Sequence, residues 1–368
     1  MHVSNYSENA ELEGKTMKQY KVLVNRVTYE KTKDYLAKLQ SGEIAGKYLQ
    51  EKLNDHDLST LTVERFLDVL MNTKLPQIFA ESAVYGDGLD WNLKELSILG
   101  DIGIATPVTV YDNGKHYNPD VYDEPFYATL LFTPGALLRS SSNIPADLDE
   151  VTDNGSIDSN KYYALYERRL LPLFIYANQV AKQNNKQAFI TIPGLGCGQF
   201  AGRFMGQLGV ELKKSLVTLL NTHGKNFSNI QVVYYDPYQE CENERHEIQD
   251  VSFFVRPLLK GNEQKPQLCH PKMYEEVGDD FSECELFSCV AWDHVSWPGN
   301  DFYAGARATD DGVKAAATNS MTVMTGVEGV YNKENHCYCP PEQYSNWREV
   351  IVKNNIRLEA EGNLRVTE

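Results

Sequence analysis

Basic residues are scarce in this chain of 368 residues. Lys and Arg number 35 against 51 Asp and Glu, which gives a formal net charge of −16 at pH 7. Proteins that bind nucleic acids or anionic membranes without specificity depend on Lys and Arg to neutralise phosphates. The charge balance therefore argues against a nucleic-acid partner and is better matched by a basic protein partner.

Long apolar runs are also missing. The longest apolar stretch lies around residues 170–181, where Pro172 interrupts it, and it is too short to span a bilayer. The first 20 residues are polar and contain Glu, unlike a secretory signal. We therefore expect no membrane insertion, and we expect residues 1–18 to form a disordered lead-in.

Cysteine is infrequent and irregularly spaced. The seven cysteines are an odd number without the spacing of a disulfide framework, which favours a reducing compartment such as the cytoplasm. Cys269-His270 and the Cys-x-Cys at positions 337–339 do not match a structural-zinc spacing. We therefore expect neither a metal nor a cofactor. Cys197 would need a nearby His to act as a nucleophile, and a small side chain among glycines is the preferred explanation for it.

Glycine, in contrast, is concentrated in one segment. Four glycines at positions 194, 196, 198 and 202 follow a β-branched stretch, and residues 203–221 carry apolar side chains near helical spacing. A strand, a glycine loop and a helix start can form an anion-binding cradle, because backbone N–H groups approach a phosphate closely there. The segment predicts a phosphate-bearing ligand, with a tight turn that binds nothing as the alternative.

Two common phosphate-binding motifs do not fit this segment. A P-loop requires Gly-Lys-Ser or Gly-Lys-Thr, and the chain has Gly202-Arg203-Phe204 at that place. The dinucleotide fingerprint Gly-x-Gly-x-x-Gly fits only in part, because its third glycine position holds Gln199. ATP hydrolysis is therefore disfavoured.

Strand-like and helix-like segments alternate along the chain. Strands are predicted at residues 21–29, 108–111, 127–132, 230–235, 251–255 and 286–292, and helices at residues 61–73 and 161–183. Residues 140–160 are rich in Ser, Asp and Asn and are interpreted as a surface excursion. The alternation predicts an α/β fold with parallel segments in its sheet.

Three aspartates follow the strand predicted at residues 286–292. Asp293 comes directly after it, Asp301 lies in the next loop, and Asp311 opens a helix predicted to run to residue 321. Ligands in α/β sheets bind beyond the carboxyl ends of strands, so this loop and the glycine loop should face one site. Carboxylates there can stabilise an oxocarbenium-like centre and activate water. Each also has a structural alternative: a strand-end turn for Asp293, a plain loop position for Asp301, and a helix cap for Asp310 or Asp311.

The two loops together resemble those of macrodomains. Residues 190–202 are similar to the macrodomain phosphate loop, and residues 290–293 and 300–305 with the helix from Asp311 are similar to the loop around the distal ribose. The ribose loop follows the phosphate loop here, which resembles the permuted order of poly(ADP-ribose) glycohydrolases. The paired catalytic glutamates of those enzymes are absent, which argues against polymer trimming. The resemblance implies a mixed sheet flanked by helices, with residues 19–150 as an N-terminal extension packed on or contributing to a core at residues 151–368.

The spacing of the aspartates is similar to that in macrodomain hydrolases among Legionella effectors. That resemblance implies a secreted effector acting in the host cytosol, which cleaves the N-glycosidic bond between ADP-ribose and an arginine of ubiquitin or another modified protein. It implies that the catalytic residues are Asp293, Asp301 and Asp311. The residues implied to bind ADP-ribose are Gly194, Leu195, Gly196, Cys197, Gly198, Gln199, Phe200, Ala201, Asp236, Tyr303 and Gly305.

The roles follow from the same resemblance. The loop N–H groups would hold the pyrophosphate, and Phe200 and Tyr303 would flank the distal ribose. Asp301 and Asp311 would flank the scissile bond, one acting on water and the other on the guanidinium, while Asp293 orients a ribose hydroxyl. Asp236 and Tyr238 are candidates for contacting the adenine for a different reason, because the strand predicted at residues 230–235 should neighbour the glycine loop; a turn at Pro237 with a surface Tyr is the alternative.

Two other functions stay open at this point. The chain could be a reader that binds ADP-ribose without cleaving it. It could also be an interaction scaffold whose N-terminal part recruits a partner.

Overall fold

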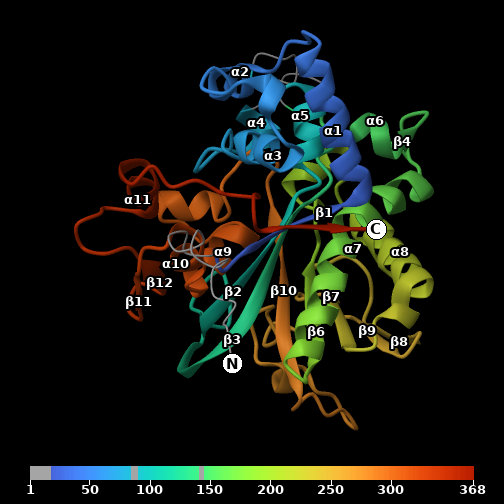
Figure 1. The fold of residues 1–368 in the computed structure, drawn as a ribbon. Helices are drawn as coiled ribbons and strands as arrows, with labels where there is room; N and C mark the ends of the chain where they lie inside the picture. Colours follow the sequence, from blue (N-terminus) through green and yellow to red (C-terminus); the bar gives the residue numbers. More distant parts are fainter. Residues whose placement is uncertain (1–17, 84–89, 141–144) are drawn as a thin grey trace, which may run out of the picture.

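A computed structural model describes residues 18–83, 90–140 and 145–368 (Figure 1). Residues 1–17 of the expected lead-in lie outside these ranges. Within them, nine strands form one mixed sheet in the order β13-β1-β2-β3-β10-β6-β7-β9-β8. The strands are β1 (Lys21–Asn25), β2 (Gly103–Asp112), β3 (Val121–Pro134), β6 (Gln187–Pro193), β7 (Ile230–Asp236), β8 (Glu244–Ile248), β9 (Val251–Val255), β10 (Cys284–Trp292) and β13 (Leu364–Thr367).

Helices surround this sheet. They are α1 (Arg26–Gln40), α2 (Lys47–Leu53), α3 (Val63–Met71), α4 (Ala80–Ala83), α5 (Leu93–Leu99), α6 (Leu148–Val151), α7 (Ser159–Gln183), α8 (Leu208–His223), α9 (Asp310–Ala317), α10 (Ser320–Thr325) and α11 (Trp347–Lys353). Short 3-10 helices include η2 (Gln199–Phe204) and η5 (Asn300–Ala304). Two small hairpins are β4 (Thr152–Asp153) with β5 (Ser156–Ile157), and β11 (Val330–Asn332) with β12 (Cys337–Cys339). None of the described helices is long and apolar enough to cross a membrane.

The centre of the sheet is parallel. β3 pairs with β10, β10 with β6, β6 with β7, and β7 with β9, all in parallel. The segments that follow these strands, starting at Gly135, Gly194, Pro237 and Asp293, therefore leave the sheet at one edge. β1 and β2, from the N-terminal part of the chain, lie in this sheet next to β3.

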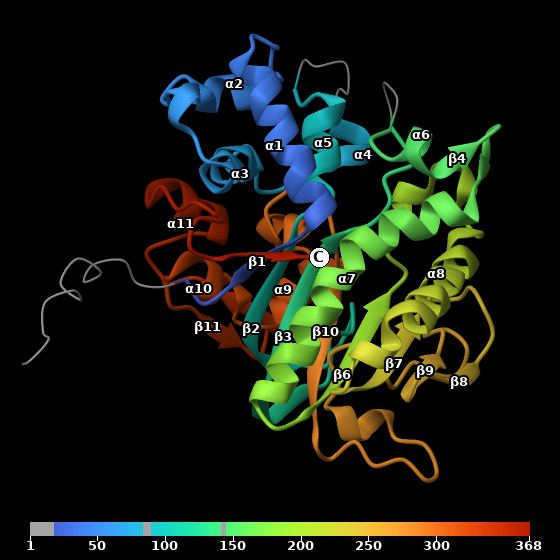
Figure 2. The same cartoon turned by 45° about the vertical axis from the view of Figure 1, so that its right-hand side comes forward.

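Alternating side chains bury the two faces of the sheet against different helices. Ile190 belongs to the apolar cluster formed with α7 and α8, and Phe189 to the cluster that includes α9, α10 and the N-terminal helices. Figure 2 shows α7 and α8 along one face, and both views place α1 to α5 together at one end of the sheet. The three-layer α/β arrangement agrees with the macrodomain-like fold expected from the sequence.

Several element boundaries differ from the sequence prediction. The strand predicted at residues 21–29 ends at Asn25, because the Asn25 side chain accepts the Val27 N–H and caps α1. The helix predicted from residue 203 begins only at Leu208, because Gly202 (φ 54°) and Gly206 (φ 82°) take left-handed backbone conformations before it. The helix predicted to reach residue 321 ends at Ala317, where Thr318 is extended, and α10 follows separately.

The other predicted elements are confirmed, with one qualification. Each remaining predicted segment contains one observed element or lies within it. The matches are residues 61–73 with α3, 108–111 with β2, 127–132 with β3, 161–183 with α7, 230–235 with β7, 251–255 with β9 and 286–292 with β10. In the surface excursion predicted at residues 140–160, most described residues are exposed or half-buried. Asp147 and Val151 are buried there, and Asp147 accepts hydrogen bonds in the interior.

Candidate functional site

The glycine loop, residues 194–202, follows β6 at the parallel edge of the sheet and rests on the turn after β3. A side chain is excluded from Gly135 in that turn, because a Cβ there would lie 2.3 Å from the Gly196 backbone nitrogen. The Tyr166 hydroxyl of α7 donates to the Leu195 carbonyl (2.6 Å) and accepts the Ala136 N–H (3.0 Å). The buried tyrosine thus joins the helix, the β3 turn and the glycine loop.

The loop uses part of its own hydrogen-bonding capacity. The N–H groups of Leu195, Cys197 and Ala201 donate to the carbonyls of Pro193, Gly194 and Gly198, respectively. The N–H groups of Gly196 and Gly198 have no hydrogen-bond partner among the described residues, and the space beside Gly198 is open. Among the loop amides predicted to hold pyrophosphate, these two therefore have an N–H group free to donate to a ligand.

Cys197 is enclosed in this loop. Its side chain is buried and its Sγ lies 3.6 Å from the Leu195 carbonyl. Burial raises the pKa of the Cys197 thiol well above its usual range. A thiol that resists ionisation is a poor nucleophile, which supports a packing role for this residue.

Asp301 and Asp311 lie together around Thr309. Asp301, in η5, accepts the N–H groups of Ala308 (2.7 Å) and Thr309 (3.1 Å). The Thr309 hydroxyl contacts the Asp301 carboxylate and also lies 2.8 Å from the Asp311 carboxyl. Thr309 rather than either adjacent aspartate is the N-cap of α9, so the cap alternative for Asp310 and Asp311 is wrong.

The Asp311 carboxyl group is well shielded from solvent. It is 2% exposed and accepts the Gly299 N–H (3.2 Å). Burial raises the pKa of Asp311 to about 8, with the charges of Asp301 and Asp310 raising it and the Thr309 hydrogen bond opposing the shift. Asp311 therefore retains its proton at neutral pH, as a general acid must.

Gly312 packs directly on this pair. A Cβ at Gly312 would lie 1.9 Å from Asp301 Oδ1. Any other residue at this position would displace the Asp301 carboxylate, so glycine is a steric requirement of the aspartate pair.

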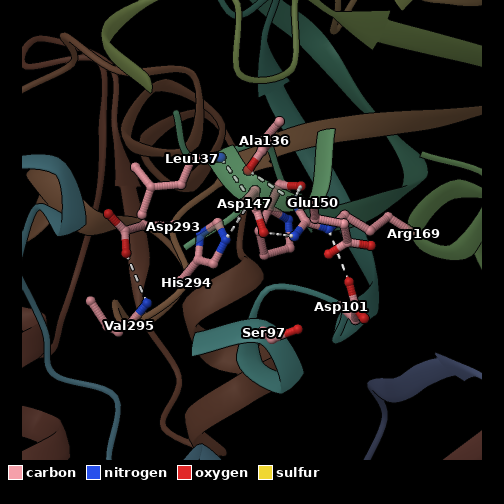
Figure 3. Close-up of polar contacts among 12 residues, drawn as sticks. Ser97, Asp101, Ala136, Leu137, Asp147, Glu150, Arg169, Asp293, His294 and Val295 are labelled. Atoms are coloured by element: carbon pink, nitrogen blue, oxygen red, sulfur yellow. Dashed lines mark hydrogen bonds and ion pairs between the residues drawn. The ribbon is translucent and has the colours of Figure 1, made fainter. Parts of the chain in front are cut away.

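Asp293 has different partners from the other two aspartates. Its Oδ1 accepts the Val295 N–H at 2.8 Å (Figure 3). Its Oδ2 accepts the N–H of Ala80 in α4, also at 2.8 Å. Burial raises the pKa of Asp293. No hydrogen bond among the described residues joins Asp293 to Asp301 or Asp311. Of the three predicted catalytic residues, only Asp301 and Asp311 are therefore linked by hydrogen bonds, through Thr309.

Lys74 adds a buried amine beside the Asp293 turn. Its Nζ donates to the His294 carbonyl and lies 4.1 Å from the centre of the Trp292 ring. Burial lowers the pKa of Lys74 to about 7, although the nearby Asp293 charge opposes that shift. Motif reasoning gave no signal for this residue, because its role depends on contacts with a segment more than 200 positions away.

The adenine candidates lie at the end of β7. Asp236 Oδ1 accepts the N–H groups of Tyr238 and Leu258, each at 2.8 Å, and the Gln267 side chain donates to Oδ2 (3.3 Å). Gln267 in turn accepts from Lys314 of α9 (2.8 Å). Tyr238 is 55% exposed with φ 61°, so a turn is present and its ring stays accessible to a ligand.

The last two predicted ligand residues lie in and after η5. Tyr303 is buried, and its hydroxyl donates to the Pro298 carbonyl (3.1 Å). Gly305 has φ 76° and ends η5. Phe200, from the glycine loop, has its ring centre 6.0 Å from that of His294, which brings the two loops into contact.

A buried ionic network beneath the loops was missed by the sequence interpretation. Asp147 accepts from Arg169 (2.8 Å), from the Leu137 N–H (2.7 Å) and pairs with His294 Nε2 (3.1 Å) (Figure 3). Arg169 also pairs with Asp101 (3.1 Å), which follows α5. Burial opposes ionisation of Asp147, but the Arg169 and His294 charges hold its pKa below its usual range.

Two cavities lie elsewhere. One of about 460 Å³ lies between α7 and β13, and one of about 290 Å³ lies against β2 and β3. Neither is lined by the glycine loop or by the three aspartates.

Comparison with known protein families gives a match over most of the chain. A family model described as "Macrodomain effector MavL" matches residues 20–344, a range that includes the glycine loop, all three aspartates and the N-terminal helices. A search of curated proteins finds no match.

Proposed function

The chain belongs to the MavL family of macrodomain effectors, and from that premise we propose that it is a hydrolase that removes ADP-ribose from arginine side chains. Family membership itself implies an ADP-ribose-related function for a secreted bacterial effector. The finer proposal is cleavage of the N-glycosidic bond to arginine, with ubiquitin or another arginine-ADP-ribosylated protein as substrate. We place this activity in the host cytosol and expect it to need neither a metal nor a cofactor.

The observation that carries the proposal is the hydrogen-bonded Asp301–Thr309–Asp311 group, in which both aspartates are buried. The two loops follow neighbouring parallel strands, β10 and β6. An ADP-ribose whose pyrophosphate lies on Gly196 and Gly198 can direct its distal ribose toward the loop after β10. The acids then face the anomeric carbon rather than the phosphates.

The two aspartates suit a balanced hydrolysis. The bond between C1″ and the guanidino nitrogen breaks with its electron pair going to that nitrogen, and a water oxygen bonds to C1″. Asp301 accepts the proton from water, and the protonated Asp311 delivers one to the departing guanidine. Thr309, in contact with both carboxyl groups, offers a route for the proton to return.

Asp293 takes a positioning role in this proposal. Its carboxylate is fixed by two backbone N–H groups and orients a hydroxyl of the distal ribose. Phe200 and Tyr303 flank the ribose, and Asp236 with Tyr238 hold the adenine. The residues of the glycine loop from Gly194 to Ala201 hold the diphosphate.

The test is release of ADP-ribose from defined linkages. The protein is incubated with arginine-, serine- and glutamate-linked ADP-ribosyl proteins, including modified ubiquitin, and free ADP-ribose is measured. We expect release from the arginine linkage alone. Binding of ADP-ribose without any release would instead identify a reader, and release from serine or glutamate only would overturn the arginine assignment.

The catalytic placement is tested with Asp301→Ala and Asp311→Ala. We expect each variant to lose at least about a hundredfold in kcat/KM, as expected for loss of an acid or base. Affinity for free ADP-ribose is measured in parallel by calorimetry and should change far less. Full turnover in both variants would show that other groups carry the chemistry.

A further inference from the structure

The segment before α4 runs alongside the loop after β10. Leu75 donates its N–H to the Val295 carbonyl and accepts the Trp297 N–H, both at 2.9 Å. Ala80, the first residue of α4, donates its N–H to Asp293 Oδ2 at 2.8 Å. The N-terminal helices therefore reach the proposed active site and fix one of its carboxylates.

Glu81 follows Ala80 and so lies beside Asp293. Its side chain is half-buried, and its Oε2 atom is enclosed without a hydrogen-bond partner among the described residues. Burial raises the pKa of Glu81, and a hydrogen bond from its own backbone N–H opposes that effect. The charge of Asp293 raises the pKa further, while the Arg139 charge lowers it. An enclosed carboxylate oxygen without a donor is costly, and native structures leave few of them.

Arg139 connects Glu81 to the other half of the site. Its guanidinium donates to Gln199 Oε1 in the glycine loop at 2.6 Å, and its charge acts on Glu81. The Glu81 carboxylate therefore follows the residue that binds Asp293 and is within electrostatic reach of an arginine that contacts the glycine loop.

We infer that Glu81 determines specificity by binding the guanidinium of the arginine that carries ADP-ribose, an inference that rests on the proposed function. A guanidinium offers five N–H donors in a rigid plane together with a positive charge. It can satisfy the enclosed Glu81 oxygen while its charge offsets the two neighbouring carboxylates, Glu81 and Asp293. A ribose hydroxyl offers only one neutral donor, so the repulsion between the Glu81 and Asp293 carboxylates would remain.

The experiment measures guanidinium binding separately from hydrolysis. The full-length protein is saturated with ADP-ribose and titrated with agmatine, a small guanidinium compound, by calorimetry or NMR. The variants are Glu81→Gln, Glu81→Asp and, as a matched control, Glu51→Gln at an exposed position of α2. We expect Glu81→Gln to weaken agmatine binding about tenfold or more, the loss of one charge-assisted hydrogen bond.

ADP-ribose affinity should stay within about twofold of wild type in all variants, and Glu81→Asp should lose less agmatine affinity than Glu81→Gln. The inference is overturned by undetectable agmatine binding in the wild type, by unchanged agmatine binding in Glu81→Gln, or by a parallel loss of ADP-ribose affinity. Failure of the wild type to release ADP-ribose from arginine would sink the proposed function alone, because agmatine binding is read independently.

Discussion

At the scale of single residues, the surroundings of Asp311 determine whether its side chain is protonated. Nothing in the local sequence distinguishes it from Asp310, which directly precedes it. In the fold, Asp311 is enclosed, whereas Asp310 is half-buried and pairs with Lys314 (2.9 Å). Burial raises the pKa of Asp311 to about 8, and this makes it the better candidate for a general acid.

The raised pKa of Asp311 predicts a pH-dependent cost to stability. The folded state holds this proton up to about pH 8, whereas the unfolded chain releases it near the usual pKa of 3.8. The folded state therefore binds more protons between these values, and the free energy of unfolding falls as pH rises across that window. Asp311→Asn removes the titrating group and with it this pH dependence. The free energy of unfolding of the variant, relative to that of wild type, should therefore rise by up to about 1.4 kcal/mol per pH unit and level off above pH 8.

Urea unfolding at pH 5, 6, 7, 8 and 9 measures this effect. Asp149→Asn, at an exposed position, serves as the control and should follow the wild-type profile. Parallel profiles for Asp311→Asn and wild type would show that Asp311 is ionised in the folded protein.

Helix α7 matters at the scale of elements because one of its residues shapes the glycine loop. The Tyr166 hydroxyl bonds to the loop at the Leu195 carbonyl and to the β3 turn at the Ala136 N–H. Both partners are backbone groups, and the phenol is buried. Removing the hydroxyl leaves the buried Ala136 N–H without a partner and leaves the Leu195 carbonyl with only the weak Cys197 thiol donor at 3.6 Å.

Tyr166→Phe is therefore expected to loosen the glycine loop. We expect a loss of about 1–3 kcal/mol in the free energy of unfolding, with weaker ADP-ribose binding, because the loop amides are no longer held in one arrangement. Tyr163→Phe is the matched control, since that hydroxyl is on the same helix but bonds to Glu167 at the half-buried surface. Equal ADP-ribose affinity in both variants would show that the Tyr166 contact does not organise the loop.

The elements also show what the sequence could and could not reveal. Most strands and helices followed from apolar periodicity, and the glycine loop from its composition, because both signals are local. The start of α8 was misplaced by five residues, since the backbone angles of Gly202 and Gly206 have no sequence signature beyond glycine itself. The contacts of Ala80 with Asp293 and of Asp147 with Arg169 join distant segments, so no local pattern could reveal them.

On the scale of the whole molecule, the N-terminal part belongs to the same sheet as the site. β1 to β3 come from residues 21–134, and β3 pairs directly with β10. The ionic network from Asp101 through Arg169 and Asp147 to His294 joins the end of α5 to the residue after Asp293. Displacement of the N-terminal helices would thus change the positions of the carboxylates in the site.

Asp147 is the centre of that network, because it bonds to Arg169, His294 and the Leu137 N–H. Its lowered pKa means that the ionised form is stabilised in the fold, a contribution present above the unfolded pKa of about 3.8 and lost as pH falls through the folded value. Asp147→Asn leaves the buried Arg169 guanidinium with less compensation, so we expect a loss on the order of 3–5 kcal/mol at pH 7. Urea unfolding should show that loss, with Asp153→Asn at the exposed β4 position close to wild type. His294 and Leu137 lose the same charged partner in this variant. The folded protein should therefore also bind ADP-ribose more weakly. An unchanged ADP-ribose affinity would show that the network stabilises the fold without positioning the site.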